Sequence, residues 1–329
     1  MNKKFIALAV AALVSGAANA ASIYEDEATT VGISGEIDTF LSQFESDVAG
    51  ADLDADADLW AKIQVDAQHK LNDTVTVFGS FEMENGESYG ENGSKDIKTD
   101  DLYFGANIGE HFGIAAGETG DFADSFNAIT IDNTNEGYGY MDDFVSDFES
   151  DGHTIALKYD IAGLELVADT YLDEDSDADN AYGVSASYTV AGFNIGASYQ
   201  DHGNRTTDKV DGKYVTNNGD NDVYGVKLGY SGDSFSIATH YVVEQKDSVD
   251  TNVIGLAADY KFDAARIYAS GFVADQDDAE EDLTAYTVGA DYAFSNNVLA
   301  FVEYSAQENS EYTKDTDTAL YLAGIYYTF

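Results

Sequence analysis

The chain has 329 residues, of which 62 are acidic and 15 are basic, and its formal net charge at pH 7 is −47. It contains no cysteine, which excludes a disulfide framework, a thiolate metal site and a cysteine nucleophile. A charge of this sign repels phosphate backbones and excludes a nucleic-acid partner. The 23 tyrosines and 18 phenylalanines distinguish the sequence from a disordered acidic chain, so we expect a folded, β-rich protein.

The first 20 residues predict a secretory signal peptide. Lys3 and Lys4 are positive, residues 5–14 form an apolar run, and Ala18-Asn19-Ala20 has the small residues of a cleavage site. The apolar run is shorter than the ~20 residues that a transmembrane helix needs. We therefore expect residues 1–20 to be cleaved, and residues 21–329 to form a single exported domain that can reside in a membrane only through strands.

Alternation of apolar and polar residues predicts β-strands from residue 31 to the end of the chain. From Leu59 to Ala67 the odd positions are apolar, and from Lys62 to Gln68 the even positions are polar. A period of two gives a strand one apolar and one polar face. Such segments predict sixteen strands, over residues 31–40, 57–69, 74–84, 98–108, 112–119, 152–160, 163–172, 181–191, 192–201, 222–231, 234–244, 251–262, 264–274, 282–294, 297–307 and 316–329.

The connections between these segments alternate in length. The short ones, such as Asn72-Asp73 and Ala191-Gly192, carry Gly, Asn or Asp, which tolerate the backbone angles of tight hairpins. Short turns on one rim and long loops on the other are typical of an outer-membrane β-barrel. The longer, acidic connections are residues 41–56, 85–97, 120–151, 173–180, 202–221, 245–250, 275–281 and 308–315.

Segment length favours a membrane barrel over a soluble sandwich. The segments run over ~9–13 residues and match the ~9–11 that cross a bilayer, whereas strands of globular proteins are most often ~5–6 residues long. An even number of strands lets the sheet close without free edges. Tyrosines near strand ends, such as Tyr188, Tyr230 and Tyr292, are typical of an interfacial girdle. We therefore expect an all-β, 16-stranded antiparallel transmembrane β-barrel.

The last predicted strand carries the sharpest signal. Tyr321, Ala323, Ile325, Tyr327 and Phe329 alternate on one face, and phenylalanine is the final residue. With the signal peptide, the strand count and the long third loop, this ending resembles the general (diffusion) porins of Gram-negative bacteria, particularly those of marine gamma-proteobacteria. The resemblance covers the whole chain. It implies an outer-membrane location, a homotrimer, and an assembly signal at Phe329, supported by Tyr327, that the outer-membrane assembly machinery recognises.

Residues 120–151 form the longest connection. A loop of this length in a compact protein is usually functional, and the resemblance implies that it folds into the barrel as a constriction loop. Phe122 and Phe126 are among the aromatic residues that would hold it against the wall. The sequence lacks the Pro-Glu-Phe-Gly-Gly motif of enterobacterial porins, so a solvated external loop is the alternative. The predicted pore-lining acids of the loop are Asp121, Asp124, Asp132, Glu136, Asp142, Asp143, Asp147 and Glu149.

The opposing wall is also acidic. The alternation predicts that Glu36, Asp38, Lys62, Asp66, Glu82 and Asp101 face the lumen, and only Lys62 among them is basic. In the general porins, which this chain resembles, a ladder of arginines on this wall faces the acidic loop and produces an electric field across the pore. This chain has few basic residues at the corresponding positions. Because rings of Asp and Glu are the common cation filter, we predict a water-filled, cation-preferring channel for passive diffusion of ions and small hydrophilic solutes.

Two other functions remain open. One is a substrate-specific porin, for example for oligosaccharides, since the single tryptophan, Trp60, is predicted to face the lumen. The other is a structural or adhesive barrel with little transport.

Two acidic runs and the histidines indicate no resident metal. Asp52–Asp58 and Asp173–Asp179 place an aspartate at every second position but lack the glycine and distal glutamate of an EF-hand. We interpret both runs as hydrated rim; the alternative is weak binding of divalent cations that link the rim to lipid and lipopolysaccharide. The five histidines form no zinc pattern and no Gly-x-Ser-x-Gly elbow occurs. We expect no catalytic residue, no enzyme activity, no metal and no cofactor.

Overall fold

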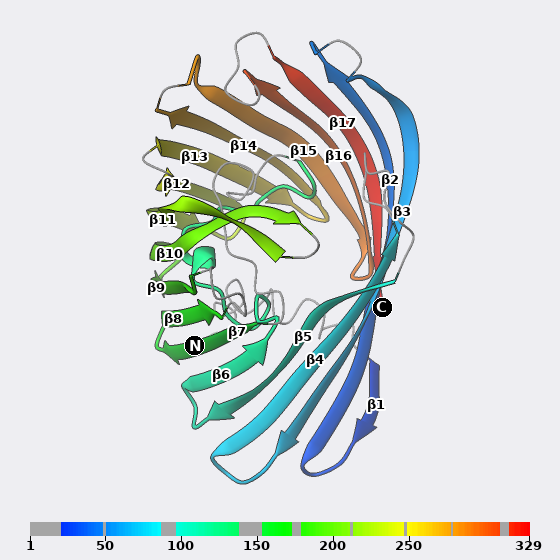
Figure 1. Ribbon diagram of the computed structural model, residues 1–329. Coiled ribbons are helices and arrows are strands. Elements are labelled where there is room, and N and C mark those ends of the chain that lie inside the picture. Colours follow the sequence, from blue (N-terminus) through cyan, green and yellow to red (C-terminus); the bar gives the residue numbers. More distant parts are fainter. Residues whose placement is uncertain are drawn as a thin grey trace.

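The computed structural model describes residues 21–48, 51–86, 97–137, 153–172, 179–210, 213–246, 249–277, 279–309 and 316–329. Over these residues the chain is almost entirely strand, and sixteen antiparallel strands form one closed barrel (Figure 1). This confirms the predicted fold class. The predicted signal peptide lies outside the described residues. Among the described residues, no helix has both the length and the hydropathy needed to cross a membrane.

The strands and one short 3-10 helix follow one another along the chain. They are β1 (Ala21–Glu25), β2 (Thr29–Ser46), β3 (Leu53–Lys70), β4 (Val75–Gly86), β5 (Lys98–Ile108), β6 (Phe112–Gly117), η1 (Phe126–Ala128), β7 (Thr154–Ile161), β8 (Leu164–Tyr171), β9 (Ala181–Val190), β10 (Phe193–Val210), β11 (Lys213–Ser231), β12 (Phe235–Lys246), β13 (Val249–Phe262), β14 (Ala265–Gln276), β15 (Leu283–Ser295), β16 (Val298–Glu308) and β17 (Thr318–Thr328).

The barrel closes between its last strand and its first full strand. From β2 onward each strand pairs with its successor, and β17 returns to β2 with Tyr327 opposite Ile37 (Figure 1). Phe329 continues this seam, because its backbone N–H and C=O both bond to Gly35 at 2.9 Å. Closure gives the spanning backbone its hydrogen-bond partners, which a bilayer cannot supply.

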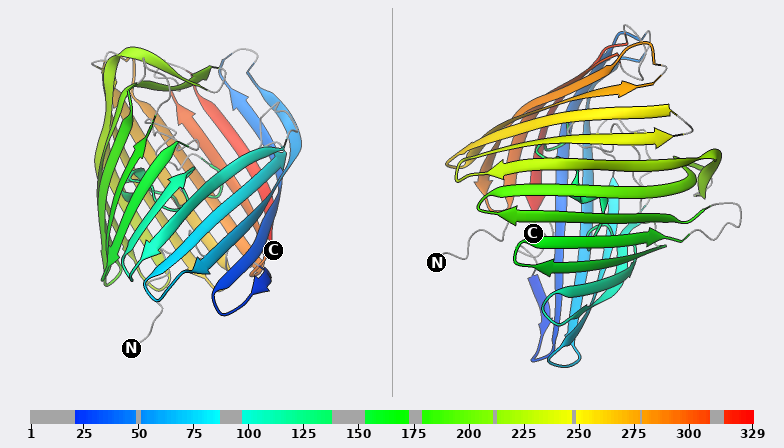
Figure 2. Two further views of the ribbon diagram at one scale, coloured as in Figure 1. Left: turned by 60° about the horizontal axis from the view of Figure 1, so that its bottom comes forward. Right: turned by 90° about the vertical axis from the view of Figure 1, so that its left-hand side faces the viewer.

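Several predicted boundaries were wrong. The short strand β1, which pairs with β2, was not expected, and all five of its residues are exposed. Residues 202–221 were expected to be a loop, but β10 and β11 extend through most of them as a hairpin that reaches past neighbouring strand ends (Figure 2). Likewise β2 runs to Ser46 and β3 begins at Leu53, inside the expected loop 41–56. Above the bilayer a strand needs no apolar face, so its alternation is lost while its pairing continues.

The outward face of the barrel is apolar. On β13, for example, Ile254 and Leu256 are 58% and 55% exposed, whereas their neighbours Val253 and Ala257 are 0% and 3% exposed. Leu102 and Phe104 on β5 and Val226 and Leu228 on β11 repeat the exposed apolar pattern. An apolar belt of this extent matches the lipid-facing band of a membrane barrel.

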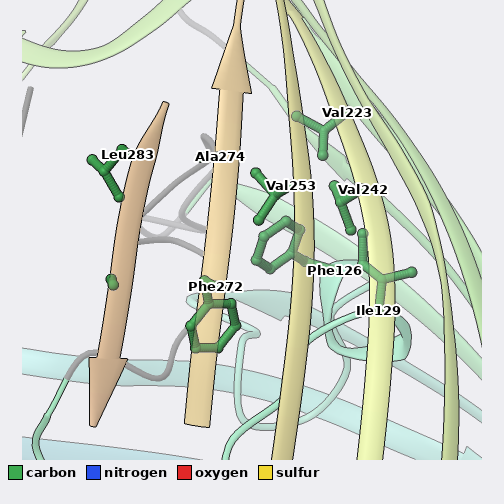
Figure 3. Packing of buried hydrophobic residues seen from close by; sticks show 9 residues of the cluster. Phe126, Ile129, Val223, Val242, Val253, Phe272, Ala274 and Leu283 are labelled. Atoms are coloured by element: carbon green, nitrogen blue, oxygen red, sulfur yellow. The ribbon is translucent and has the colours of Figure 1, made fainter. Parts of the chain in front are cut away.

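The inward face is apolar as well on one side of the barrel. Phe126 and Ile129, which follow β6 in the chain, pack in one cluster with wall residues of β11 to β15 (Figure 3). A lumen-facing surface is expected to be polar; this part is apolar because another part of the chain covers it. The wall residues of the cluster are Val223, Val242, Val253, Phe272, Ala274, Leu283 and Ala285.

Candidate functional site

The chain turns into the barrel directly after β6. The backbone N–H groups of Phe122 and Ala123 both donate to Thr119 O, at 3.0 and 2.9 Å, and form a tight turn. The Phe122 ring lies 5.3 Å from the ring of Phe78, and both side chains pack with the inward-facing Ala115. The aromatic side chain thus holds the start of the loop against the inner wall.

The next anchor is a carboxylate on β8. Asp169, which is 6% exposed, accepts hydrogen bonds from Ser125 N at 2.6 Å and Ser125 Oγ at 3.0 Å. Gln200 on β10 donates to the same hydroxyl at 3.2 Å. Asp124 turns back instead and accepts from Phe126 N at 2.8 Å, which fixes the start of η1.

Basic side chains of the wall bind the loop backbone. Lys227 Nζ on β11 donates to Asn127 O at 3.0 Å and to Thr130 O at 2.7 Å. Arg266 on β14 donates to Asn133 O at 3.1 Å and pairs with Asp291 at 2.6 Å. These two cations are therefore occupied with holding the loop.

The last described residues of the loop are held by a second buried carboxylate, Glu303 on β16. It accepts from Asn135 N at 2.6 Å, from Glu136 N at 3.0 Å and from Tyr268 Oη at 2.7 Å. Tyr326 on β17 donates to Glu136 Oε1 at 2.5 Å. Residues 119–137 therefore follow the inside of the barrel as far as β17, and do not form an external loop. We call the inward faces of β8 to β17, which carry these contacts, the loop-bearing wall.

Glu136, among these last described residues, meets further acids. Burial raises the pKa of Glu136 to about 7, and the charges of Glu303 and Glu36 act in the same direction, while the hydrogen bond from Tyr326 opposes them. Asp38, on the neighbouring β2, is 5% exposed and its charge interacts with that of Glu136. The described part of the loop thus reaches the place where β17 meets the acidic side of the barrel.

The inward faces of β2 to β5 form what we call the acidic wall. Lys62 Nζ pairs with Glu82 Oε2 at 3.1 Å. The exposed Asp121 of the loop interacts electrostatically with Lys62, Glu82 and Asp101. The residues of this wall are Glu36, Asp38, Lys62, Asp66, Glu82, Asp100 and Asp101, with Asp66 accepting from Ser80 Oγ at 2.8 Å.

Asp100 joins this wall beside Asp101, although strict alternation puts consecutive residues on opposite faces of a strand. The register between β4 and β5 shifts after Phe81, so that Glu82 lies opposite Asp100 and Asp101 is an extra residue. A bulge of this kind brings two consecutive side chains to one side of a sheet. Carboxylate oxygens of Glu82, Asp100 and Asp101 lie within 4.8 Å of one another, a spacing that a metal ion could bridge. Since Lys62 already pairs with Glu82, we treat the group as part of the charged wall.

The predicted loop acids fall into three groups. Asp121 and Asp132 are exposed on the loop, and Asp132 interacts electrostatically with Lys227. Asp124 and Glu136 are partly buried and take part in the contacts described above. The remaining four, Asp142, Asp143, Asp147 and Glu149, lie outside the described residues. The anchors Ser125, Asp169, Tyr268, Glu303 and Tyr326 were not predicted, because none of them lies in a motif that distinguishes it from other residues of its type.

The predicted assembly signal lies on the lipid-facing surface beside the seam. The rings of Tyr327 and Phe329 are 5.8 Å apart, and the two side chains are 45% and 37% exposed. A Cβ atom on Gly35 would lie 2.5 Å from Phe329 Cζ, so the Phe329 ring rests on a position without a side chain.

Comparisons with known proteins agree over nearly the whole length of the chain. A family model described as Gram-negative porin matches residues 7–327. Outer membrane porin protein OmpD of Citrobacter koseri is 24% identical and covers 96% of this chain and 95% of its own length. Porin-like protein L of Photobacterium profundum is 24% identical over 100% of both chains. The solved trimer form of OmpT, an outer membrane protein of Vibrio cholerae, has a TM-score of 0.71 at 17% identity and covers 92% of this chain and 100% of its own.

Proposed function

Because the chain belongs to the Gram-negative porin family, we propose that it forms a water-filled, cation-preferring channel for passive diffusion of ions and small hydrophilic solutes. It is an outer-membrane porin, as the sequence analysis expected. The absence of an enzyme activity stays a prediction.

One observation carries the cation preference: the acidic wall and the loop present unbalanced negative charge to the lumen. Six of the seven residues named above for the acidic wall are carboxylates, and the seventh, Lys62, is paired with Glu82. The register places two more lysines on this side of the sheet, Lys70, which pairs with Asp73, and Lys98, which lies opposite Glu84. On the loop-bearing wall Lys227 and Arg266 bind loop carbonyls and Asp291. A lumen of one sign concentrates counter-ions and excludes co-ions, an effect that salt weakens.

The test is the reversal potential of the purified protein in a planar bilayer under a KCl gradient. We expect the sign that marks potassium permeation. Asp121→Lys should lower the cation-to-anion permeability ratio by about twofold, because it exchanges one charge for its opposite beside Lys62 and Asp101. Asp73→Lys is the matched control, since Asp73 lies in the turn before β4 with a fully exposed side chain. An anion-favouring potential in the wild type would exclude the proposed preference.

We propose that residues 120–151 act as the constriction loop. Contacts of residues 119–137 with inward side chains from β4 to β17 support this proposal. The test measures the size above which solutes no longer pass through the channel. In liposome-swelling assays with sugars of increasing size, the wild type should show a sharp size limit. Asp169→Asn, which weakens the anchor of Ser125, should raise that limit.

We also propose a homotrimer. The related OmpT of Vibrio cholerae has been solved in a trimer form, and small residues on the outward face of β2 to β5, such as Ala61, Ala67 and Ala106, permit close approach of another subunit. Sedimentation in detergent should give three chains per particle. In single-channel records, each inserted particle should show three equal conductance steps, one for each subunit. A monomer in both experiments would contradict the proposal.

Two further partners are proposed at the ends of the molecule. The assembly machinery would recognise Phe329 with Tyr327, and deletion of Phe329 should reduce the amount of barrel in the outer membrane.

Lipopolysaccharide would meet the acidic rim through divalent cations, and titration calorimetry with Ca²⁺ tests this contact.

A further inference from the structure

The described part of the loop follows a row of inward-facing glycines. On β9 and β10, Gly183 and Gly196 lie directly under the loop. A Cβ atom at Gly183 would overlap Ser125 Oγ, and one at Gly196 would overlap the carbonyl oxygen of Ala128. At these two positions the loop therefore reaches a depth that only a residue without a side chain permits.

Three further glycines on the loop-bearing wall lie under aromatic side chains on the neighbouring strand. A Cβ atom at any of these glycines would overlap the ring opposite, so each ring can lie flat on the wall only because its partner has no side chain. In the register of the sheet the pairs are His240 with Gly255, Tyr268 with Gly289 and Phe301 with Gly324.

All three rings hold the loop, two directly and one through a neighbour. His240 Nδ1 bonds to Ile129 O at 3.0 Å, and Asn135 Nδ2 donates to Tyr268 Oη at 2.7 Å. The Phe301 ring packs at 4.9 Å against the ring of Tyr326, which in turn donates to Glu136. The depth of each ring in the wall thus determines how far the loop stands from the strands.

We propose that these five glycines, Gly183, Gly196, Gly255, Gly289 and Gly324, set the width of the pore by fixing how deeply the loop is seated in the wall. They act as positioning residues, since they carry no side chain that a solute could touch. The inference rests on the proposed channel function and names the part of the wall that determines its size limit.

The experiment measures single-channel conductance of the full mature protein with one methyl group added at a time. In Gly196→Ala the new methyl pushes the loop backbone towards the lumen, and in Gly289→Ala it does so through Tyr268. We expect conductance to fall by about 1.5-fold or more in each, with an unchanged reversal potential because no charge changes. The control is Gly229→Ala on β11, where a Cβ atom would meet nothing closer than 3.7 Å.

A compensating pair gives a second, independent measurement. Gly324→Ala should also reduce conductance, and Phe301→Leu in the same chain should restore it, because the smaller leucine leaves room for the methyl group. A general loss of stability would not be reversed in this way. If the wild type conducts no ions, the proposed function itself fails. If the wild type conducts and the alanine variants conduct equally well or better, or the double variant stays low, the glycine assignment is overturned.

Discussion

The acidic wall and the loop-bearing wall are built from the same alternating strands, yet their inward side chains do different work. On β2 to β5 many inward residues are carboxylates, such as Glu36 and Glu82, and the base beside them, Lys62, is paired with Glu82. On β8 to β17 inward residues such as Asp169 and Glu303 hold the loop, and apolar ones such as Val253 are covered. A period of two decides which side chains face inward, but not whether they meet water or another part of the chain.

Removing the main anchor of the last described loop residues should give the largest effect. Glu303→Ala leaves two backbone N–H groups and the Tyr268 hydroxyl without their acceptor, so the free energy of unfolding should fall by about 3 kcal/mol. Denaturant unfolding in detergent measures this change. Glu308→Ala, at the exposed end of the same strand, is the control and should change stability by less than about 0.5 kcal/mol. If both variants lose the same free energy of unfolding, Glu303 does not anchor the loop more than an ordinary acidic residue would.

Two lysines test the comparison directly, because each substitution removes one positive charge. Lys62→Met on the acidic wall should raise the cation-to-anion permeability ratio by about twofold, since it leaves the carboxylates there unopposed. Lys227→Met on the loop-bearing wall should change that ratio less and instead increase current noise, since its ammonium group binds Asn127 O and Thr130 O. Reversal potentials and noise spectra give both values. Equal shifts in selectivity would show that the two walls do not differ in function.

The smallest expected effect is a change with pH in how often the channel closes, and it involves Glu136, where the described loop meets the acidic wall. The pKa of Glu136 is raised from 4.5 to about 7. Folding therefore favours its protonated form, and the stabilisation is complete below pH about 4.5 and is lost as the pH rises through about 7. Closures of the channel should be rarer at pH 5 than at pH 8. The groups around Glu136 are Glu36 and Asp38 on β2, Glu303 on β16 and Tyr326 on β17.

The variant Glu136→Gln separates this carboxyl group from the other acids of the lumen. It keeps a side chain of the same size without the titration, so its closure rate should be flat between pH 5 and 8. A wild-type profile that persists in Glu136→Gln would assign the pH dependence to another residue.

The sequence was sufficient for the parts of the fold that lipid dictates. Strand number and the outward face followed from apolar residues such as Ile63, Leu102 and Val226, because a bilayer accepts no other kind of side chain there. The parts that lipid does not touch were predicted less well. The extensions of β10 and β11 lie above the belt, and β1 has no apolar alternation to mark it.

The candidate site was predictable in its charge but not in its contacts. Alternation predicts Asp38, Lys62 and Glu82 on the inner face from the period of a strand alone; in the structure Asp38 and Glu82 are buried and Lys62 pairs with Glu82. It could not place Asp100, because a bulge shifts the register after Phe81. Nor could it tell anchors from pore-lining acids, because the partners of Glu303 are backbone groups more than 160 residues away in the chain.

The seam between β17 and β2 makes the final residues of the chain a condition for the stability of β2. Until Phe329 reaches Gly35, one edge of β2 has unpaired N–H and C=O groups that hydrocarbon cannot satisfy. A nascent or truncated polypeptide therefore has no partially inserted form of low energy, and membrane entry should be coupled to completion of synthesis and export.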